Sequence, residues 1–207
     1  MSDKKTLFAL PNLLTYARII VIPAVFWLIY TGESDFENFV ACGLYALACI
    51  TDYFDGYFSR KWKITSELGR FLDPIADKLL VAATLFALVL ARFDSLWISV
   101  IALVIISREI FVSGLREYLG NRQVKMPVSK LAKWKTASQL FSLGFLIAGR
   151  AIDPAYKYAV GESALSWWNW FLHYSYWTGA ALLTLAAALT IITGAQYMRR
   201  AFDYMRK

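Results

Sequence analysis

Six apolar runs, each long enough to cross a bilayer as a helix, are separated by short polar segments along this chain of 207 residues. A helix rises about 1.5 Å per residue, so about 20 apolar residues span the hydrocarbon core. A hydrophobic content of 58% is also unusual for a soluble globular domain. We therefore predict an all-α integral membrane protein with six transmembrane helices, at Leu13–Tyr30, Phe39–Phe58, Phe71–Ala91, Leu96–Leu115, Trp134–Ala151 and Phe171–Met198.

The chain shows no internal repeat, low-complexity tract or linker, so we predict a single six-helix membrane domain over residues 11–207. Residues 1–10 combine two lysines with Leu7, Phe8 and Leu10. This mixture is typical of a short amphipathic helix at the membrane interface, and simple disorder is the equal alternative.

Aromatic and small residues near the last two predicted helices have structural interpretations. The segment Trp167–Trp170 is typical of an interfacial aromatic belt. His173, the only histidine, lies in the same region and away from the aspartates, so we expect no catalytic role for it. Glycines in these helices are expected to permit close helix contact and not to bind phosphate: Gly144, Gly149, Gly179 and Gly194.

Basic residues alternate between the two sides of the predicted bundle. Short cytoplasmic loops carry an excess of Lys and Arg. Here that excess falls before the first helix, between the second and third, between the fourth and fifth, and after the sixth, at Lys4, Lys5, Arg60, Lys61, Lys63, Arg70, Arg122, Lys125, Lys130, Lys133, Arg199, Arg200, Arg206 and Lys207. We therefore predict an inner or plasma membrane protein with both termini in the cytoplasm.

Four aspartates interrupt the apolar pattern around the junction of the second and third predicted helices. Asp52 and Asp55 lie three residues apart, and Asp73 and Asp77 lie four apart, so each pair shares one helix face. A carboxylate at membrane depth costs roughly 2.5–3.5 kcal/mol, and four together repel one another unless cations neutralise them. Oxygen-only ligands favour hard ions, so the cluster predicts a Mg²⁺ or Mn²⁺ site at the cytoplasmic end of these helices.

The aspartates belong to a longer pattern, Asp52-x2-Asp55-Gly56-x2-Ser59-Arg60-x8-Gly69-x3-Asp73-x3-Asp77. It resembles the signature of the CDP-alcohol phosphotransferase family, which usually has alanine at the position of Ser59. Four acids, two glycines and an arginine at fixed spacing make this a specific signal. The resemblance covers Pro11 to about Thr136. Three flanking segments are similar to the bacterial members that use glycerol 3-phosphate: Pro11–Arg18, Phe71–Lys78 and Ser107–Glu117.

The resemblance implies the fold of this family and a metal-dependent, homodimeric enzyme of phospholipid biosynthesis. Such an enzyme transfers a phosphatidyl group from CDP-diacylglycerol to sn-glycerol 3-phosphate, giving phosphatidylglycerophosphate and CMP. Two metal ions would neutralise the diphosphate, with Asp52, Asp55 and Asp73 as ligands and Asp77 close enough to contribute. The last acid of the family motif is its proposed general base, and that position is Asp77.

The remaining motif residues, together with Asp52, are expected to meet the nucleotide. Gly56 and Gly69 would let it approach the helix backbone, with helix packing as the alternative. Arg60 is expected to contact phosphate, with a role as a cytoplasmic anchor as the alternative. Further nucleotide contacts are expected from the family-like start of the first helix, at Asn12, Thr15 and Arg18.

A second group of charged residues suits the phosphate of an acceptor. Arg108 and Arg116 lie eight residues apart, close to one face of the fourth predicted helix, and Lys135 opens the fifth helix on the same side. Arginine suits bidentate phosphate recognition, and charges within the membrane favour a pocket. The alternative is structural pairing of the arginines with Glu109 or Glu117.

Other functions remain open at this point. Inositol phosphate, serine or another phosphatidyl acceptor would use the same metal centre, although the basic residues favour a phosphorylated acceptor. A cation transporter lined by acids is less favoured, because the acids cluster at one membrane end. The expected partners are the two substrates, membrane lipids and a second copy of the chain, and no nucleic acid.

Overall fold

The computed structural model describes residues 10–32, 34–62, 67–91, 96–122, 130–149 and 167–206. Within these ranges the chain forms six helices and no strand: α2 (Leu10–Thr31), α3 (Asp35–Trp62), α4 (Glu67–Leu90), α5 (Leu96–Asn121), α6 (Lys130–Gly149) and α8 (Trp167–Met205). Each predicted apolar run overlaps one of these helices, so the all-α fold class is confirmed. The predicted interfacial segment lies outside the described residues, apart from Leu10 at the start of α2.

Three of the six helices are long and apolar enough to cross a membrane on length and composition alone. These spans are Asn12–Thr31, Leu96–Gly120 and Trp170–Met205, with mean hydropathies of 1.9, 2.0 and 1.7. In α3 and α4 the apolar pattern is interrupted by the four aspartates, and in α6 by polar residues of its first half. The membrane character is thus confirmed, whereas transmembrane placement of α3, α4 and α6 stays a prediction.

The outer surface of the bundle is apolar. Ile20 is 75% exposed, Ile110 is 68% exposed, and large aromatic side chains on several helices are similarly open. At the N-terminal part of α8, Trp170, Tyr174 and Trp177 are each at least half exposed. Exposed apolar surface around all-helical elements suits contact with lipid, where helices satisfy their own backbone hydrogen bonds.

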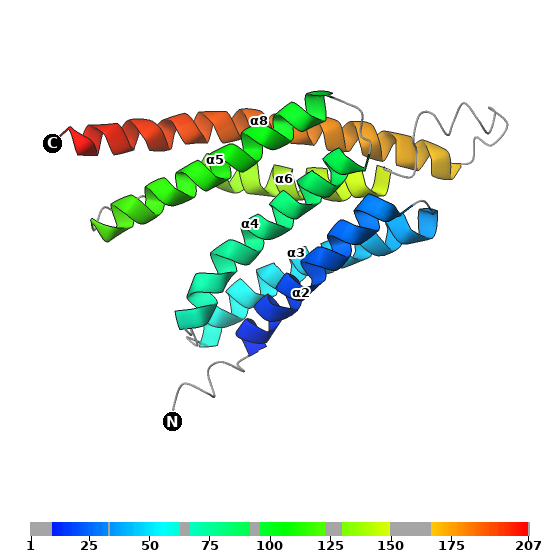
Figure 1. Ribbon diagram of the computed structural model, residues 1–207, viewed down its shortest axis with the longest axis horizontal. Coiled ribbons are helices and arrows are strands. Elements are labelled where there is room, and N and C mark those ends of the chain that lie inside the picture. Colours follow the sequence, from blue (N-terminus) through cyan, green and yellow to red (C-terminus); the bar gives the residue numbers. More distant parts are fainter. Residues whose placement is uncertain are drawn as a thin grey trace.

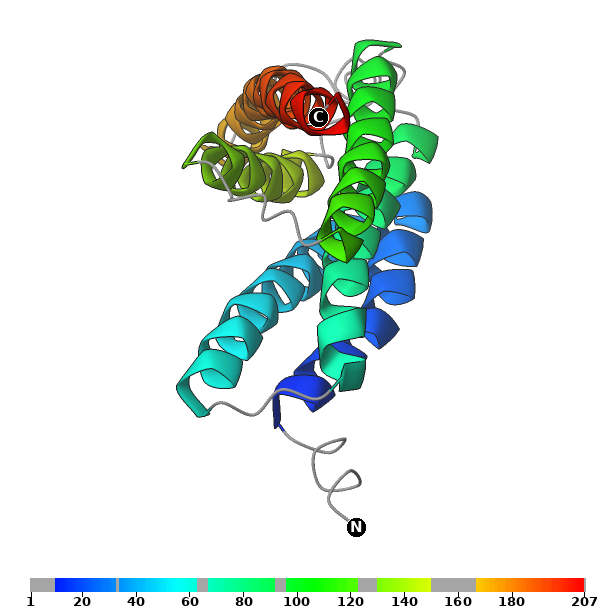
Figure 2. The same cartoon turned by 90° about the vertical axis from the view of Figure 1, so that its left-hand side faces the viewer.

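The helices pack in two groups that meet along the middle of the molecule. In the first group α2 packs against both α3 and α4, and in the second α8 packs against α6 and α5. Figure 2 shows the α6–α8 pair beside the α2–α3–α4 group, with α5 running along α4. Figure 1 shows that the start of α2, the end of α3, the start of α4 and the ends of α5 and α8 all lie toward one side.

Glycines allow α6 and α8 to pack closely. A Cβ atom at Gly149 would lie 2.5 Å from the backbone nitrogen of Tyr176, and one at Gly179 would lie 2.9 Å from the backbone nitrogen of Leu146. Both distances are too short for a real side chain, so only glycine permits this separation. The prediction that these two glycines serve helix packing is confirmed.

A continuous apolar core holds the two groups together. It contains fully buried residues of α2, α4 and α6, among them Ile29, Leu85, Leu88, Leu143 and Ile147. Buried polar side chains interrupt this core toward the end that holds the start of α2, where Thr15, Arg18 and Asp55 are each no more than 3% exposed. Because polar groups are costly to bury unless they are hydrogen-bonded or paired, a cluster of them marks this end of the bundle as the candidate functional site.

Candidate functional site

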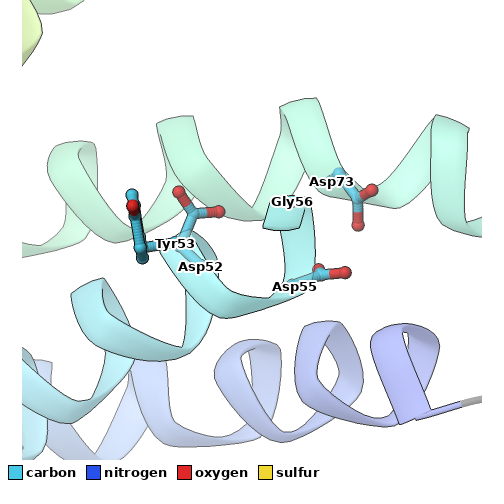
Figure 3. A pocket seen from close by; sticks show the side chains of 5 residues that line it. All are labelled: Asp52, Tyr53, Asp55, Gly56 and Asp73. Atoms are coloured by element: carbon cyan, nitrogen blue, oxygen red, sulfur yellow. The ribbon is translucent and has the colours of Figure 1, made fainter. Parts of the chain in front are cut away.

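A cavity of about 260 Å³ lies at this end, between α3 and α4. Its lining residues are Asp52, Tyr53, Asp55, Gly56 and Asp73 (Figure 3). Asp52 and Asp55 extend from neighbouring turns of α3, and Asp73 extends from the facing helix α4. The three-residue spacing on α3 places both of its acids beside the same cavity, as the helical repeat requires. The structure thereby brings together three of the four aspartates of the sequence motif.

Thr15 of α2 joins the carboxylates of the two other helices. Its hydroxyl oxygen Oγ1 lies 2.7 Å from Asp55 Oδ2 and 2.7 Å from Asp73 Oδ1. A hydroxyl carries one proton, so it donates to only one of these carboxylates at a time. Thr15 therefore fixes the position of both acids while leaving much of their negative charge uncompensated.

Arg18, one turn further along α2, supplies a positive charge to the same acids. Its side chain is completely buried, with Nη1 2.5 Å from Asp52 Oδ1 and Nη2 3.7 Å from Asp55 Oδ2. Within the described residues the guanidinium nitrogens make no hydrogen bond of good geometry. The contact of Arg18 with the two aspartates is therefore mainly an electrostatic attraction between opposite charges. Asp52 is 44% exposed at its side chain and Asp55 only 4%. Arg18 thus compensates a carboxylate that opens to the cavity and one that is buried.

The charges of this group do not balance. Three carboxylates face one guanidinium, which leaves two formal negative charges when all groups are ionised. The donors are all oxygen atoms, as a hard divalent cation prefers. In the described part of the chain, no three acidic, histidine or cysteine side chains are grouped closely enough to hold a metal ion as they stand. The chemistry of Asp52, Asp55 and Asp73 fits such an ion, provided that their carboxylates turn toward one another.

The other residues that were predicted to meet the nucleotide belong to the same three helices, α2, α3 and α4. Gly69 is buried on α4, one turn before Asp73, and Asn12 is buried on α2, close to one turn before Thr15. Gly56 is part of the cavity lining. Arg60 belongs to α3, but its side chain lies outside the described residues. All of these positions belong to the same end of the α2–α3–α4 group.

Asp77 lies one turn beyond Asp73 on α4 and does not line the cavity. It lies within electrostatic range of Asp52 and Arg18 of the acidic group. It also interacts with Glu109 of α5 and Lys135 of α6. Asp77 therefore links the acidic group to a second set of charged residues.

The second set contains the three basic residues that the sequence suggested for an anion. Glu109 of α5 forms ion pairs with two of them. One is with Lys135 Nζ, and the other is with Arg108 Nη1 at 3.4 Å. The alternative of structural pairing of an arginine with Glu109 is thus present in the structure for Arg108, and Lys135 pairs with the same glutamate. Glu117 is exposed. One glutamate against three basic side chains still leaves this set with an excess of positive charge.

Two residues of α8 complete the second set, and sequence reasoning did not identify them. Thr193 Oγ1 accepts a hydrogen bond of 2.7 Å from Arg108 Nη2, and Tyr197 accepts one of 2.9 Å from Arg116 Nη2 at its hydroxyl. Their spacing of four residues puts both on one face of α8. That spacing is the only signal in the sequence, and it does not reveal which helix the face meets.

Comparisons with known proteins confirm the family that the sequence resembles. The sequence model of the CDP-alcohol phosphatidyltransferase family matches residues 8–175. A CDP-diacylglycerol–glycerol-3-phosphate 3-phosphatidyltransferase of Cereibacter sphaeroides is 34% identical, with 96% of this chain and 98% of the relative aligned. Proteins of the same name from Rickettsia typhi and Escherichia coli are 41% and 33% identical, each over 94% of this chain and over 98% and 95% of their own lengths.

Proposed function

Since this chain belongs to the CDP-alcohol phosphatidyltransferase family, we propose that it transfers a phosphatidyl group from CDP-diacylglycerol to sn-glycerol 3-phosphate. The products are phosphatidylglycerophosphate and CMP. The three relatives described above are all named for this reaction, and each aligns over nearly its whole length. They give no support to the alternative of a cation transporter.

The observation that carries the proposal is the presence of two sets of opposite charge: a cavity lined by Asp52, Asp55 and Asp73, and a basic set that contains Arg108, Arg116 and Lys135. Asp77 interacts with Asp52 of the acidic group and with Lys135 of the basic group. A transfer between two phosphate-bearing substrates needs one site for a diphosphate and its cations and another for the second phosphate. Asp77, one turn beyond Asp73 on α4 and within electrostatic range of both sets, is suitably placed to act on a hydroxyl between them.

On the donor side, we propose that Asp52, Asp55 and Asp73 hold a divalent cation, Mg²⁺ or Mn²⁺, and that a second ion binds with the nucleotide. When bound, these ions neutralise the diphosphate and stabilise the leaving CMP. Thr15 holds Asp55 and Asp73 in position, and Gly56 lets the nucleotide approach the backbone of α3. Gly69 and Asn12, at the same end of the bundle, are proposed to contact the nucleotide. Arg60 is proposed to contact the phosphates of the nucleotide.

On the acceptor side, we propose that Arg108, Arg116 and Lys135 bind the phosphate of glycerol 3-phosphate. With Glu109 included, the formal charge of this set is two positive. A phosphomonoester carries about −1.5 to −2 charges at pH 7, so the set and this acceptor are complementary. Serine lacks such a phosphate, whereas inositol phosphate would satisfy the same residues and is the closest alternative.

The chemical step forms one bond and breaks another. The acceptor hydroxyl oxygen attacks the phosphorus attached to diacylglycerol, and the bond from that phosphorus to the bridging oxygen of CMP breaks. CMP leaves with the electron pair, and Asp77 takes the hydroxyl proton. General base catalysis of this kind contributes about 10²- to 10⁴-fold to the rate.

The decisive experiment measures CMP release by the purified protein in detergent micelles that contain CDP-diacylglycerol. Glycerol 3-phosphate, inositol phosphate and serine are compared as acceptors, each with Mg²⁺, with Mn²⁺ and with excess EDTA. We expect strong stimulation by glycerol 3-phosphate and loss of activity in EDTA. CMP release that glycerol 3-phosphate does not increase would rule out this acceptor, and full activity in EDTA would rule out the metal.

We also propose a topology and an assembly. Both termini and the carboxylate site face the cytoplasm, because the ends of helices gathered on one side of Figure 1 carry basic residues such as Lys61, Arg122, Arg199 and Arg200. The protein is proposed to form a homodimer, as the family resemblance implies. Labelling of single introduced cysteines from each side of sealed vesicles tests the topology, and light scattering of the detergent-solubilised protein tests the dimer.

A further inference from the structure

One face of α8 meets both arginines of the proposed acceptor site. Helix α5, which carries the arginines, crosses α8, as Figure 1 shows. Thr193 contacts Arg108, and Tyr197, one turn later, contacts Arg116. These contacts lie beyond residue 175, where the match to the family model ends. The part of the chain outside that match therefore touches the residues proposed to bind the acceptor.

Thr193 is oriented as an acceptor for Arg108. Its hydroxyl donates to backbone carbonyl oxygens of α8, 2.7 Å from that of Leu189 and 3.2 Å from that of Thr190. With its single proton engaged there, the oxygen has lone pairs to accept from Arg108 Nη2 at 2.7 Å. Thr193 is also fully buried, so the contact is not shared with water. It fixes one edge of the Arg108 guanidinium.

Tyr197 supports both arginines with one ring. The guanidinium carbons of Arg108 and Arg116 lie 5.8 Å and 5.1 Å from its ring centroid. The negative face of an aromatic ring attracts cations at this range, which offsets the repulsion between two like charges held close together. The Tyr197 hydroxyl adds the hydrogen bond from Arg116. Tyr197 is 4% exposed, so it forms a fixed surface.

Gly194, between these two residues, makes room for the stem of Arg108. A Cβ atom added at Gly194 would lie 3.2 Å from Arg108 Cγ and 3.5 Å from its Nε. The first distance is tighter than an ordinary contact, so even alanine would displace Arg108 by a few tenths of an ångström. The absence of a side chain at this position thus sets where Arg108 lies.

We propose that Thr193, Gly194 and Tyr197 form a positioning face that holds Arg108 and Arg116 for the phosphate of the acceptor, and so sets the affinity for phosphorylated acceptors. This inference rests on the proposed function, because it concerns the same acceptor site. The three residues contact the arginines and not the reacting atoms, so they are positioning residues. Their loss weakens acceptor binding while the donor site on α3 and α4 stays intact.

The experiment compares four variants with the wild-type protein in micelles. Tyr197→Phe removes only the hydroxyl, Thr193→Val removes a hydroxyl at nearly constant shape, and Gly194→Ala adds one methyl group beside Arg108. Thr193→Ser restores the hydroxyl and should recover acceptor affinity. The matched control is Gly114→Ala on α5, because nothing lies within 4 Å of a Cβ at that glycine.

Steady-state kinetics give KM for glycerol 3-phosphate and for CDP-diacylglycerol separately, and thermal unfolding gives the stability of each variant. We expect KM for glycerol 3-phosphate to rise about three- to tenfold in Tyr197→Phe and Thr193→Val, as loss of one hydrogen bond to a charged group predicts. KM for CDP-diacylglycerol should stay within about twofold, as for an interaction that serves acceptor binding alone. Gly194→Ala should raise the same acceptor KM without lowering the melting temperature, since alanine favours helix.

The outcomes separate the inference from the function on which it rests. If Arg108→Gln raises KM for glycerol 3-phosphate but the α8 variants leave it unchanged, the positioning face is wrong and the proposed function stands. A parallel rise of both KM values with a fall in melting temperature would show that α8 serves stability only, which also overturns the inference. If glycerol 3-phosphate does not stimulate CMP release by the wild-type protein, the proposed function itself fails and takes this inference with it.

Discussion

The buried guanidinium of Arg18 on α2 lies 2.5 Å from Asp52 of α3, and the same guanidinium reaches Asp55 at 3.7 Å. One cation of the protein thus holds two members of the acidic group. A divalent ion at these carboxylates would meet Arg18 as a like charge. The stability of the metal-free protein and its affinity for metal are therefore coupled through Arg18.

Replacing Arg18 by glutamine should destabilise the metal-free protein. The change removes the positive partner of the buried Asp55, and breaking one side of a buried ion pair costs about 3–5 kcal/mol. Because Asp52 is partly exposed, we expect a loss of about 2–4 kcal/mol. Thermal unfolding in detergent with EDTA measures this loss of stability. With saturating Mg²⁺ the loss should be smaller, since the ion takes over the compensation of the carboxylates.

The control for this prediction is Lys133→Gln, which removes the same charge from an exposed position of α6. The free energy of unfolding of this variant should stay within about 0.5 kcal/mol of the wild-type value. Equal destabilisation by Arg18→Gln in EDTA and in Mg²⁺ would contradict the coupling between Arg18 and the metal.

Thr15→Val should also destabilise the protein, through loss of hydrogen bonding. Valine keeps the shape of threonine but leaves Asp55 and Asp73 without the hydroxyl that lies 2.7 Å from each. Loss of a hydrogen bond to a charged group costs about 1.5–3 kcal/mol. Thermal unfolding measures the loss, and Thr15→Ser should restore most of it. A Val variant as stable as wild type would show that this hydroxyl does not hold the acids.

Asp73→Asn tests the proposed metal site. The change removes one negative ligand while leaving the Thr15 contact possible through the amide oxygen. We expect Mn²⁺ affinity, measured by electron paramagnetic resonance of the free ion, to fall at least about tenfold. CMP release should need correspondingly more metal. Glu117→Gln is the matched control, because this acid is exposed on α5. Equal Mn²⁺ binding by wild type and Asp73→Asn would exclude Asp73 as a ligand.

Much of the fold could be predicted from the sequence because each helix carries its own apolar run. The run Leu13–Tyr30 predicted α2 at Leu10–Thr31, and the four-residue spacing of Asp73 and Asp77 predicted that they share a face of α4. The end of the last helix was less well predicted. Helix α8 continues to Met205, beyond the predicted Met198, because Arg199 and Arg200 end the apolar pattern without ending the helix.

The candidate site could be predicted only where its residues are close in sequence. Asp52 and Asp55 are neighbours on one helix, so their spacing is informative. The contact of Arg18 with these acids depends on how α2 packs against α3, and the contacts of Thr193 and Tyr197 depend on how α8 crosses α5. Such packing is determined by shape across the whole core, as at Gly149 and Gly179, and no local pattern of residues records it.

Gly149→Ala should destabilise the α6–α8 contact. The added Cβ would lie 2.5 Å from the backbone nitrogen and 2.8 Å from the Cα of Tyr176, and backbone atoms cannot move aside cheaply. Overpacking of this kind costs about 1–3 kcal/mol. Gly43→Ala is the control, since a Cβ there meets nothing within 4 Å and alanine favours helix. Thermal unfolding of both variants checks this, and equal stability would mean that the two helices separate without cost.

Asp77→Asn should nearly abolish turnover while the protein still folds and binds its donor substrate. Asparagine has almost the same shape as aspartate but cannot take a proton from the acceptor hydroxyl. Asp77 lies outside the cavity lined by Asp52, Asp55 and Asp73, so donor binding does not depend on it directly. We expect kcat to fall about 10²- to 10⁴-fold. Equilibrium binding of CDP-diacylglycerol should change by less than about tenfold, and thermal unfolding should remain cooperative. Loss of donor binding in parallel with turnover would make Asp77 a binding residue, and turnover near that of wild type would require another base.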